Sequence, residues 1–550
     1  MSGKTGKVNI PDAGYIREMF SECSDPIKAI NQFQTENGLQ IASLEPVLPL
    51  LDLHGLTRVH FHHSVIKVLR GKVSKALPSL PRDTLEKLLK QAFSQMQHKE
   101  LAPVGLEIMR LLDPVPAHYL KKIAAMPDVY KQCPIEVKRQ VWEKQQGLFG
   151  DEVRPILNKY IWEKDVELHK GGAEDTTQAN ISPFFAIQAR RRRDSPVIQK
   201  LRDMIGSSTP LYHMMLKFVR TLYLKNKTPH FCTLRADLLM SFHDSRQQGI
   251  YKEDPCHDFA FYIHYAVNER RIEEKIEPKL KEFYLKAISE QTEHLGDVAL
   301  ILADPYVINV VSDEIFRCLN DMIEKEMLPR DNSRLHFLLK FLNLGMHAWS
   351  IIHDDSTDEP DLNRRILKND VPLLMLCLTE DLLHSEIGSK YREGSVADFV
   401  NVAGKSPVTR CLLLHYVLQL AVAKNIERLK MIIPLLHDSI STLDEVFVHC
   451  LVSQLLLLLT EWKQVDFCNA LFDNFLSKYC QDEVMLRHVL RLLWTVHQHM
   501  DSSMISSILA NISPKPEHSQ QVRDLFNQLS ERSHLSNPGS NGPGSSGSGG

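Results

Sequence analysis

The sequence predicts an all-α protein, and three observations carry this prediction. Apolar residues recur at the spacing of one helix face along most of the chain. Several of these stretches open with residues that cap helices and end near proline. No segment combines sustained apolar–polar alternation with an Asn-Gly or Asp-Gly hairpin turn. The best strand candidate, residues 57–65, is better interpreted as a loop that leads into a helix.

Two segments show the helical period clearly. In 313–327, four apolar residues fall at i, i+4, i+7 and i+8 on one face, namely Ile315, Leu319, Met322 and Ile323. Pro329 then ends the segment. Segment 482–500 carries a wider stripe of Met485, Leu486, Val489, Leu492, Leu493 and Val496. A wide stripe indicates contact with neighbours on two sides, as in stacked helices.

Helix starts and breaks agree with this interpretation. Residues 442–445 form a capping box, because Thr442 and Glu445 can each satisfy the other's free backbone donor. Residues 83–86 form a similar opening before Leu85. Prolines divide the first part of the chain at intervals suited to short helices, at positions 49, 78, 81, 103, 114, 116 and 134.

No fixed repeat period is visible, so strict tetratricopeptide, ankyrin and leucine-rich signatures are absent. We therefore predict an irregular α-solenoid of HEAT-like helix pairs. The expected regions are a flexible N-terminus at 1–12, an N-terminal helical region at 13–170, an exposed basic loop at 171–195, middle helical repeats at 196–350, helices with acidic and polar loops at 351–407, C-terminal helical repeats at 408–533 and a disordered Gly/Ser-rich tail at 534–550.

Composition narrows the class of protein. The chain has 550 residues, a hydrophobic share of 43% and a net charge of −3, so no global field draws it to nucleic acid or membrane. None of its 10 cysteines forms a C-x-x-C pair, which argues against zinc-ribbon and thioredoxin-like sites. Cys133, Cys318, Cys377 and Cys450 resemble small buried hydrophobes, and this usage fits a reducing compartment such as cytosol or nucleus.

Membrane insertion and export are not expected. Residues 1–12 are polar and lack an apolar core of the kind found in secretory signals. The most conspicuous apolar run, 455–459, is far below the roughly 20 residues of a membrane span.

Each candidate chemical motif lacks residues that a catalytic, phosphate-binding or metal site would need. Residues 404–406 read Gly-Lys-Ser, but a phosphate loop needs another glycine at the position of Phe399, so a loop before a helix is favoured. The histidines at 54, 60, 62 and 63 lack a carboxylate or cysteine at convincing metal-ligand spacing. Cys256 and His257 are adjacent and would point about 100° apart on a helix. We expect a non-enzymatic protein without cofactor or metal, with a hydrolase that uses Cys256 or the histidines as a distant alternative.

One basic segment stands out. Arg190, Arg191, Arg192 and Arg193 follow a polar loop and could contact RNA phosphates, act as a nuclear import signal or pair with an acidic partner. A solvated charge run is an equally weighted interpretation. Nearby residues could extend the patch if the fold places them on one face: Lys200, Arg202, Lys217, Arg220, Lys225 and Lys227. Tyr212 and Tyr223 could stack on bases, although partial burial is favoured.

A second candidate site is a groove for a partner helix in the leucine-rich C-terminal part. Its candidate residues are Phe447, Leu451, Leu455 and Trp462. Each of them alone is better explained as core. The same holds for the leucines of 85–89 and 335–339, which match the L-x-x-L-L pattern of coactivator helices.

Several strings go beyond composition, and they occur in a characteristic order. They are Pro-Ile-Lys-Ala-Ile at 26–30, Gln-Phe-Gln-Thr-Glu-Asn-Gly at 32–38, Leu-Asp-Leu-His-Gly at 51–55, Glu-Val-Lys-Arg-Gln at 136–140, Leu-Phe-Gly-Asp-Glu-Val at 148–153, Cys-Thr-Leu-Arg-Ala at 232–236, Asp-Pro-Cys-His at 254–257 and Leu-Pro-Arg-Asp at 328–331. From about residue 21 to about residue 530, the chain resembles the negative elongation factor B family, which supplies the B-type component of the negative elongation factor complex. Residues 171–193 and the Gly/Ser tail depart from the family pattern.

The resemblance implies a nuclear, non-enzymatic helical-repeat subunit. It implies a bridge between the C/D-type subunit and the RNA-binding E subunit of a four-subunit complex. It also implies that the complex binds paused RNA polymerase II, together with the DRB-sensitivity-inducing factor, and represses early elongation. The alternative from the residues alone is a helical-repeat adaptor of another intracellular complex, in transport or signalling, without a role in transcription.

Overall fold

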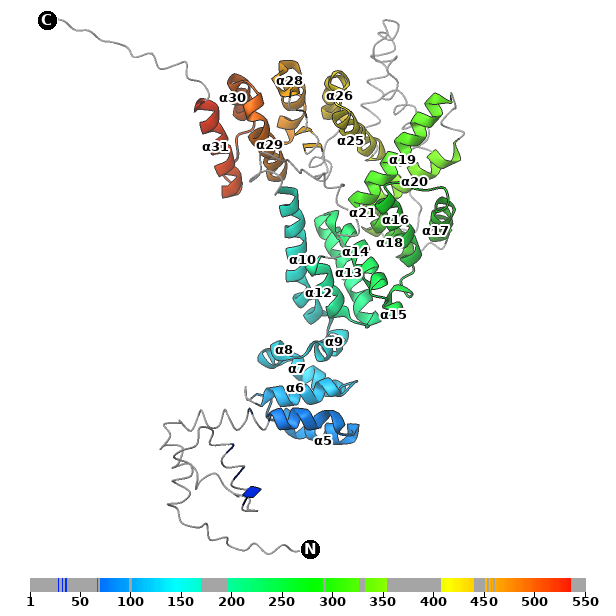
Figure 1. Ribbon diagram of the computed structural model, residues 1–550, viewed down its shortest axis with the longest axis vertical. Coiled ribbons are helices and arrows are strands. Elements are labelled where there is room, and N and C mark those ends of the chain that lie inside the picture. The colour runs from blue at the N-terminus through cyan, green and yellow to red at the C-terminus, as the bar shows by residue number, and fades with distance from the viewer. Residues whose placement is uncertain are drawn as a thin grey trace, which may run out of the picture. The chain divides into compact units, whose positions relative to one another are not determined.

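The protein is described here by a computed structural model (Figure 1). It describes residues 70–97, 101–169, 195–289, 293–325, 332–353, 407–439 and 460–535, with isolated positions between 28 and 67 and between 451 and 458. These residues are mostly helical, and none of them lies in a strand. The predicted all-α class is confirmed. The chain divides into two compact units, Met1–Leu148 and Phe149–Gly550.

Several predictions lie outside the described residues and stay predictions. They concern the N-terminus at 1–12, the histidine cluster, the strand candidate at 57–65, most of the loop at 171–195, residues 354–406 with the Gly-Lys-Ser fragment, the capping box at 442–445 and the tail beyond 535. Among the predicted buried cysteines, Cys133 and Cys318 are buried, while Cys377 and Cys450 are outside the described residues.

Proline positions set the helix starts of the first unit. Its described elements are η2 (Leu77–Ser79), α5 (Arg82–Phe93), α6 (Ala102–Leu111), α7 (Ala117–Ala124), α8 (Pro127–Gln132) and α9 (Ile135–Lys144). Pro81, Pro116 and Pro134 are the N-cap residues of α5, α7 and α9. Proline is tolerated there because the first amides of a helix have no intrahelical acceptor.

The start of α5 corrects one expectation. The sequence predicted that residues 83–86 begin the helix, with Asp83 as its cap. The N-cap is Pro81 instead, and no side chain caps this helix. Asp83 lies inside the first turn. A carboxylate there still favours the helix, because it faces the positive end of the helix dipole.

The core of the first unit forms where these short helices pack together. α5 packs on α6, and α7 contacts both α8 and α9. Leu85 and Leu89 are buried in this core, with Leu88 packed against it, so the L-x-x-L-L leucines are core residues. The indole of Trp142 donates a hydrogen bond of 2.6 Å to the Tyr130 hydroxyl, which gives a buried polar group a partner.

The boundary between the units falls near the start of α10 (Gln146–His169). The middle part of the second unit then comprises α12 (Pro196–Ile205), α13 (Thr209–Asn226), α14 (His230–Asp244), α15 (Gln248–Tyr251), α16 (His257–Glu269), α17 (Glu277–Ser289), α18 (Glu293–Leu302), α19 (Pro305–Glu324), α20 (Ser333–Met346) and α21 (Ala348–His353). Among these, α14 contacts α12, α13, α15, α16, α18 and α19 and is buried almost along its whole length. The middle part is therefore organised around α14 (Figure 1).

The C-terminal part continues with helices that pack on their neighbours. They are α25 (Pro407–Val422), α26 (Ile426–Ser439), η6 (Glu461–Lys463), α28 (Val465–Phe472), η7 (Leu476–Tyr479), α29 (Glu483–Val496), η8 (His497–His499), α30 (Ser502–Asn511) and α31 (Gln520–Leu535). Asp482 caps α29 by accepting from the amides of Val484 and Met485. The whole predicted stripe of 482–500 is buried, which confirms that helix and its face.

The predicted helix at 313–327 is the second half of a longer one. α19 begins at Pro305, and Ile315, Leu319 and Met322 are buried on it as expected. The apolar spacing alone did not predict the start of α19 at Pro305. Asp304 sets this start, because its carboxylate accepts from the amide of Tyr306 at 3.1 Å. An aspartate before a proline is a common turn and helix-start signal.

One glycine allows a close helix crossing. A Cβ atom at Gly345 on α20 would lie 2.6 Å from the carbonyl oxygen of Leu302 at the end of α18. Backbone atoms can yield only if the two helices separate. We expect Gly345→Ala to lower the free energy of unfolding by about 1–3 kcal/mol through overpacking, measured by chemical denaturation.

The matched control is Gly249→Ala on α15, where a Cβ atom would meet nothing within 4 Å. Alanine is the better helix former, so this change should be neutral or slightly stabilising. Equal stability losses in the two variants would contradict the crossing argument.

Candidate functional site

The structure describes only part of the predicted site residues. Arg190, Arg191, Arg192, Arg193 and Phe447 lie outside the described residues, so the arginine run stays a prediction. The other three groove candidates are core residues: Leu451, Leu455 and Trp462 are all buried. Trp462 packs against Phe467 and Phe472, with ring centroids 5.4 and 6.2 Å away. These side chains are therefore occupied by the chain's own packing, and a partner helix beside them stays a prediction.

Some of the residues expected to extend the basic patch contact other helices, and others are exposed. Arg220 lies 3.4 Å from the Asp297 carboxylate of α18, and the ammonium of Lys227 lies 4.0 Å from the ring centre of Trp349 on α21. Lys200, Lys217 and Lys225 are exposed. The two tyrosines near them are core residues, which excludes them from base stacking: Tyr212 and Tyr223 are buried.

A buried ion pair lies at the centre of the middle part. Arg235 on α14 and Asp254 before α16 approach to 3.1 Å, and their side chains are 1% and 0% exposed. The Asp254 carboxylate also accepts hydrogen bonds from the Tyr212 hydroxyl and, at 2.8 Å, from the Cys256 amide. Because a buried charge is tolerated only when it is paired and hydrogen-bonded, this carboxylate fixes three chain segments to one point.

The electrostatics of this cluster follow from its surroundings. Burial alone would raise the pKa of the Asp254 carboxyl, but the Arg235 guanidinium and the hydrogen bonds outweigh it and hold the pKa below its ordinary value. Burial, followed by the neighbouring Asp254 charge, raises the pKa of the Tyr212 phenol well above its ordinary value. The pair is therefore ionised and the phenol neutral at physiological pH.

A second aspartate repeats the arrangement three helices later, before α19. Asp304 also precedes a proline, is 1% exposed and accepts from an amide two residues on. Its carboxylate further accepts from the Thr233 hydroxyl of α14 at 3.1 Å. Thr233 and Arg235 thus bind the two Asp-Pro turns from the same helix, and α14 orients both α16 and α19.

The cysteine and histidine at 256 and 257 take different roles. Cys256 is the N-cap residue of α16 and is buried, and burial raises the pKa of its thiol. A thiol held protonated is a poor nucleophile, so this cysteine is structural. His257 is the first residue of α16 and half-buried, with Nδ1 at 3.2 Å from its neighbour Asp258.

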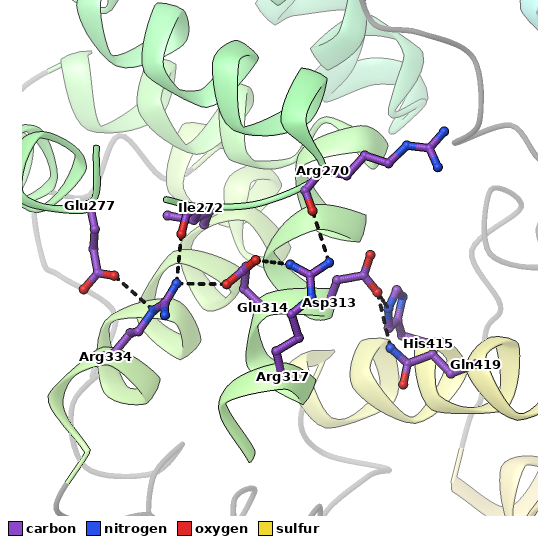
Figure 2. A network of polar contacts seen from close by, with 9 residues as sticks. All are labelled: Arg270, Ile272, Glu277, Asp313, Glu314, Arg317, Arg334, His415 and Gln419. Atoms are coloured by element: carbon purple, nitrogen blue, oxygen red, sulfur yellow. Dashed lines mark hydrogen bonds and ion pairs between the residues drawn. The ribbon is translucent and has the colours of Figure 1, made fainter. Parts of the chain in front are cut away.

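A polar network joins the helices that follow (Figure 2). Its centre is Glu314 on α19, whose side chain is 2% exposed. One carboxylate oxygen pairs with Arg317, and the other lies 2.9 Å from Arg334 at the start of α20. Arg334 also lies 3.0 Å from Glu277 at the start of α17.

The same two arginines fasten the connection between α16 and α17. Arg317 donates to the Arg270 carbonyl at 3.2 Å, and Arg334 donates to the Ile272 carbonyl at 2.8 Å (Figure 2). Both carbonyls follow the end of α16, where the regular helical ladder stops. Each guanidinium therefore satisfies a backbone acceptor and a buried carboxylate together.

Asp313 carries the network on to the C-terminal helices. Its carboxylate lies 2.7 Å from Nε2 of His415 and accepts from Gln419 at 3.3 Å, both on α25 (Figure 2). Burial would raise the pKa of Asp313, but the His415 and Gln419 contacts outweigh it and lower the pKa. Phe316 also stacks against the rings of His415 and Tyr416, each with centroids 5.7 Å apart. This interface fixes α25 to α19.

Within the described ranges, no group of three or more His, Cys, Asp or Glu side chains could hold a metal ion. No single helix in the described part of the chain has the length and apolar character to cross a membrane. The helices at 294–302 and 305–322 meet that test only as a pair, which is bent by 74°.

The comparisons with known proteins show the family of this chain. A protein-family model described as "Cofactor of BRCA1 (COBRA1)" matches residues 99–438. The chain is 35% identical to Negative elongation factor B of Drosophila melanogaster over 550 residues, which cover 96% of this chain and 91% of the relative. The proteins of the same name from Mus musculus and Homo sapiens are also 35% identical, over 94% of this chain and 92% of each relative. The chain belongs to the negative elongation factor B family.

Two of the strings that carried the resemblance meet in space. Arg235 comes from the string at 232–236, and Asp254 comes from the string at 254–257. The buried ion pair therefore joins two of the segments that carry the family resemblance. Sequence reasoning recognised the segments and missed the pairing, although two Asp-Pro dipeptides before apolar helices gave a signal.

The ion pair generates a mutational prediction. Arg235→Met leaves the Asp254 charge buried without its counterion, so we expect a loss of about 3–5 kcal/mol in the free energy of unfolding. Asp254→Asn removes the charge and keeps one acceptor oxygen, although Tyr212 and the Cys256 amide donate to different oxygens of the carboxylate. Because the two charges depend on each other, the double variant should lose less stability than the sum of the single variants. Chemical denaturation of the four proteins measures the coupling.

An independent readout comes from pH. The folded-state pKa of Asp254 is lowered, so its contribution to stability is present above the ordinary carboxyl value of about 3.9 and is lost as pH falls through the lower folded value. The wild type should lose stability in this acidic range more steeply than Asp254→Asn. Additive single effects together with identical acid profiles would contradict the coupling.

The network of Figure 2 generates a second prediction. Glu314→Gln removes the charge shared by Arg317 and Arg334, and we expect a loss of about 1–3 kcal/mol in stability. The control is Glu282→Gln on α17, whose side chain is 70% exposed and lies 3.6 Å from Lys279. An exposed pair contributes little, so the control should change stability by less than about 0.5 kcal/mol. Equal thermal shifts in the two variants would refute a special role for Glu314.

Proposed function

We propose that this chain is the non-enzymatic scaffold subunit of a negative elongation factor complex. Its membership of the negative elongation factor B family, over nearly the whole length of both chain and relatives, is the observation that carries the proposal. The described helices support it, because they join through buried polar contacts of a kind that hold one arrangement.

The finer role is a bridge between two other kinds of subunit. In this proposal the chain joins the C/D-type subunit to the RNA-binding E subunit, acts in the nucleus and helps the complex hold RNA polymerase II, with the DRB-sensitivity-inducing factor, in promoter-proximal pausing. HEAT-like stacking of the helix pairs belongs to the same proposal, since stacked pairs offer long surfaces to other polypeptides. The arginines at 190–193 would add an electrostatic contact to RNA or to an import receptor.

Affinity purification of the tagged full-length chain from nuclear extract tests this function. We expect the C/D-type and E subunits to co-purify in comparable amounts, with RNA polymerase II present at lower occupancy because it binds through the assembled complex. A matched preparation of the Arg235→Met variant shows whether capture depends on the folded middle part.

Two outcomes would contradict the proposal. Recovery of transport or signalling proteins without the other elongation factor subunits would support the alternative adaptor. A purified chain with intrinsic hydrolase activity that disappears in Cys256→Ser would contradict the non-enzymatic assignment.

A further inference from the structure

Four aromatic rings form a continuous surface patch at the junction of α14, α15 and α16. The ring of His243 is central: its centroid lies 5.4 Å from Tyr251, 5.3 Å from His257 and 5.1 Å from Phe261. Tyr251 and His257 are 4.6 Å apart. We call His243, Tyr251, His257 and Phe261 the aromatic patch.

Two rings of the patch face solvent, while Tyr251 and His257 are half-buried, with the His257 side chain 15% exposed. Phe261 is 41% exposed, and the side chain of His243 is 32% exposed. A single exposed aromatic residue on a soluble protein needs no explanation, but a contiguous group of rings marks an interaction surface. Tyrosine, histidine and phenylalanine rings also bind partners at little entropic cost, because they have few rotatable bonds.

The patch is held rigidly from below. Asp254, three residues before His257, is fixed by Arg235, Tyr212 and the Cys256 amide, and its carbonyl accepts from the His257 amide at 3.0 Å. Phe242, the residue before His243, packs its ring against Tyr212 at 5.6 Å. The buried ion pair therefore presents the aromatic patch in one conformation, which reduces the entropic cost of binding.

The charges beside the rings indicate the chemistry of the occupant. Asp258 is 67% exposed and lies 3.2 Å from the His257 ring nitrogen, and Asp244 is at the same distance from His243. Ring faces bind cations, and a carboxylate at their edge adds an ion pair. Burial lowers the pKa of His257, with the nearby His243 acting in the same direction and Asp258 and Asp254 against it, so this imidazole presents a neutral ring at physiological pH.

Other aromatic rings of the chain are covered by its own cations. Lys227 lies over Trp349 and Arg532 lies over Trp494, each at 4.0 Å. Within the described residues, no lysine or arginine lies over any ring of the aromatic patch. The exposed rings of His243 and Phe261 are therefore not occupied by a cation of the described chain.

We propose that the aromatic patch, with Asp258 at its edge, docks an arginine side chain of a partner polypeptide. A planar guanidinium can stack on Phe261 and His243 while its N–H groups donate to the carboxylate, which a lysine ammonium cannot do to the same extent. This surface goes beyond the scaffold function proposed above and does not depend on which complex the chain joins.

Fluorescence polarisation with the full-length chain tests the surface. The probe is a fluorescein-labelled octapeptide that carries two arginines among glycines, compared with the same peptide carrying lysines. We expect the arginine peptide to bind more tightly, and Phe261→Ala to weaken its binding about 5-fold, as the loss of a cation–π contact implies. Asp258→Asn should weaken it a few-fold.

Leu285→Ala is the matched control, because this leucine on α17 is 65% exposed and lies outside the aromatic patch. It should leave binding unchanged. Thermal unfolding shows whether Phe261→Ala folds as the wild type does, and Asp258→Asn, at a highly exposed residue, keeps the test decisive if it does not.

Three results would overturn the inference. They are wild-type affinity of the arginine peptide for both patch variants, an equal loss in Leu285→Ala, and failure of the wild type to bind the arginine peptide while it binds a single-stranded RNA oligonucleotide in a manner lost in Phe261→Ala. The last result would assign the rings to base stacking. Each result leaves the co-purification test of the scaffold function unaffected.

Discussion

The middle part of this chain depends on two carboxylates that one buried helix binds. Asp254 and Asp304 each lie just before a helix, and each is held by a side chain of α14. Apolar stripes bring helices together at many nearly equivalent rotations, since the hydrophobic effect has no direction. A buried carboxylate is satisfied in only one of them, because its hydrogen bonds require specific donors. The pairs Arg235–Asp254 and Thr233–Asp304 therefore select the orientation of the helices that follow.

The network around Glu314 extends the same principle to a connection between helices. The carbonyls of Arg270 and Ile272 end one helix and lead toward the next, and they accept from Arg317 and Arg334. A loop whose backbone acceptors are satisfied by side chains from neighbouring helices loses little energy when it leaves the helical ladder. The connection between α16 and α17 is thereby fixed without a regular turn.

The helix content could be predicted from the sequence, because the period of apolar residues reports directly on a buried face. The stripe at 482–500 and the buried face at 313–327 show this. Helix ends are harder to predict from the sequence, because several helices end at basic residues whose backbone has a positive φ. Lys227, Arg270 and Lys424 have φ between 52° and 56°, where glycine is the residue that sequence rules seek. Their charge lies near the negative end of a helix dipole, which offsets part of the backbone cost.

The polar contacts could not be predicted, because their partners are distant in sequence. Thr233 and Asp304 are separated by 71 positions, and Asp313 and His415 by 102. Asp304 before Pro305 signals a helix start, but nothing in either segment alone identifies the distant partner. The groove candidates illustrate the opposite problem. The apolar character of Leu455 and Trp462 allowed a surface for a partner helix but favoured a core, and the described structure places both in the core.

The contact of Asp313 with His415 fixes the position of α25 relative to α19. α19 and α25 are joined by a histidine, a glutamine and stacked rings, although residues 354–406 separate α21 from α25 in sequence. A directional contact between packed helices constrains their relative position strongly. The placement of α25 on the middle part is therefore encoded in side chains of α19 and α25. A surface on the middle part, such as the aromatic patch, is then held at a defined distance from surfaces on α25.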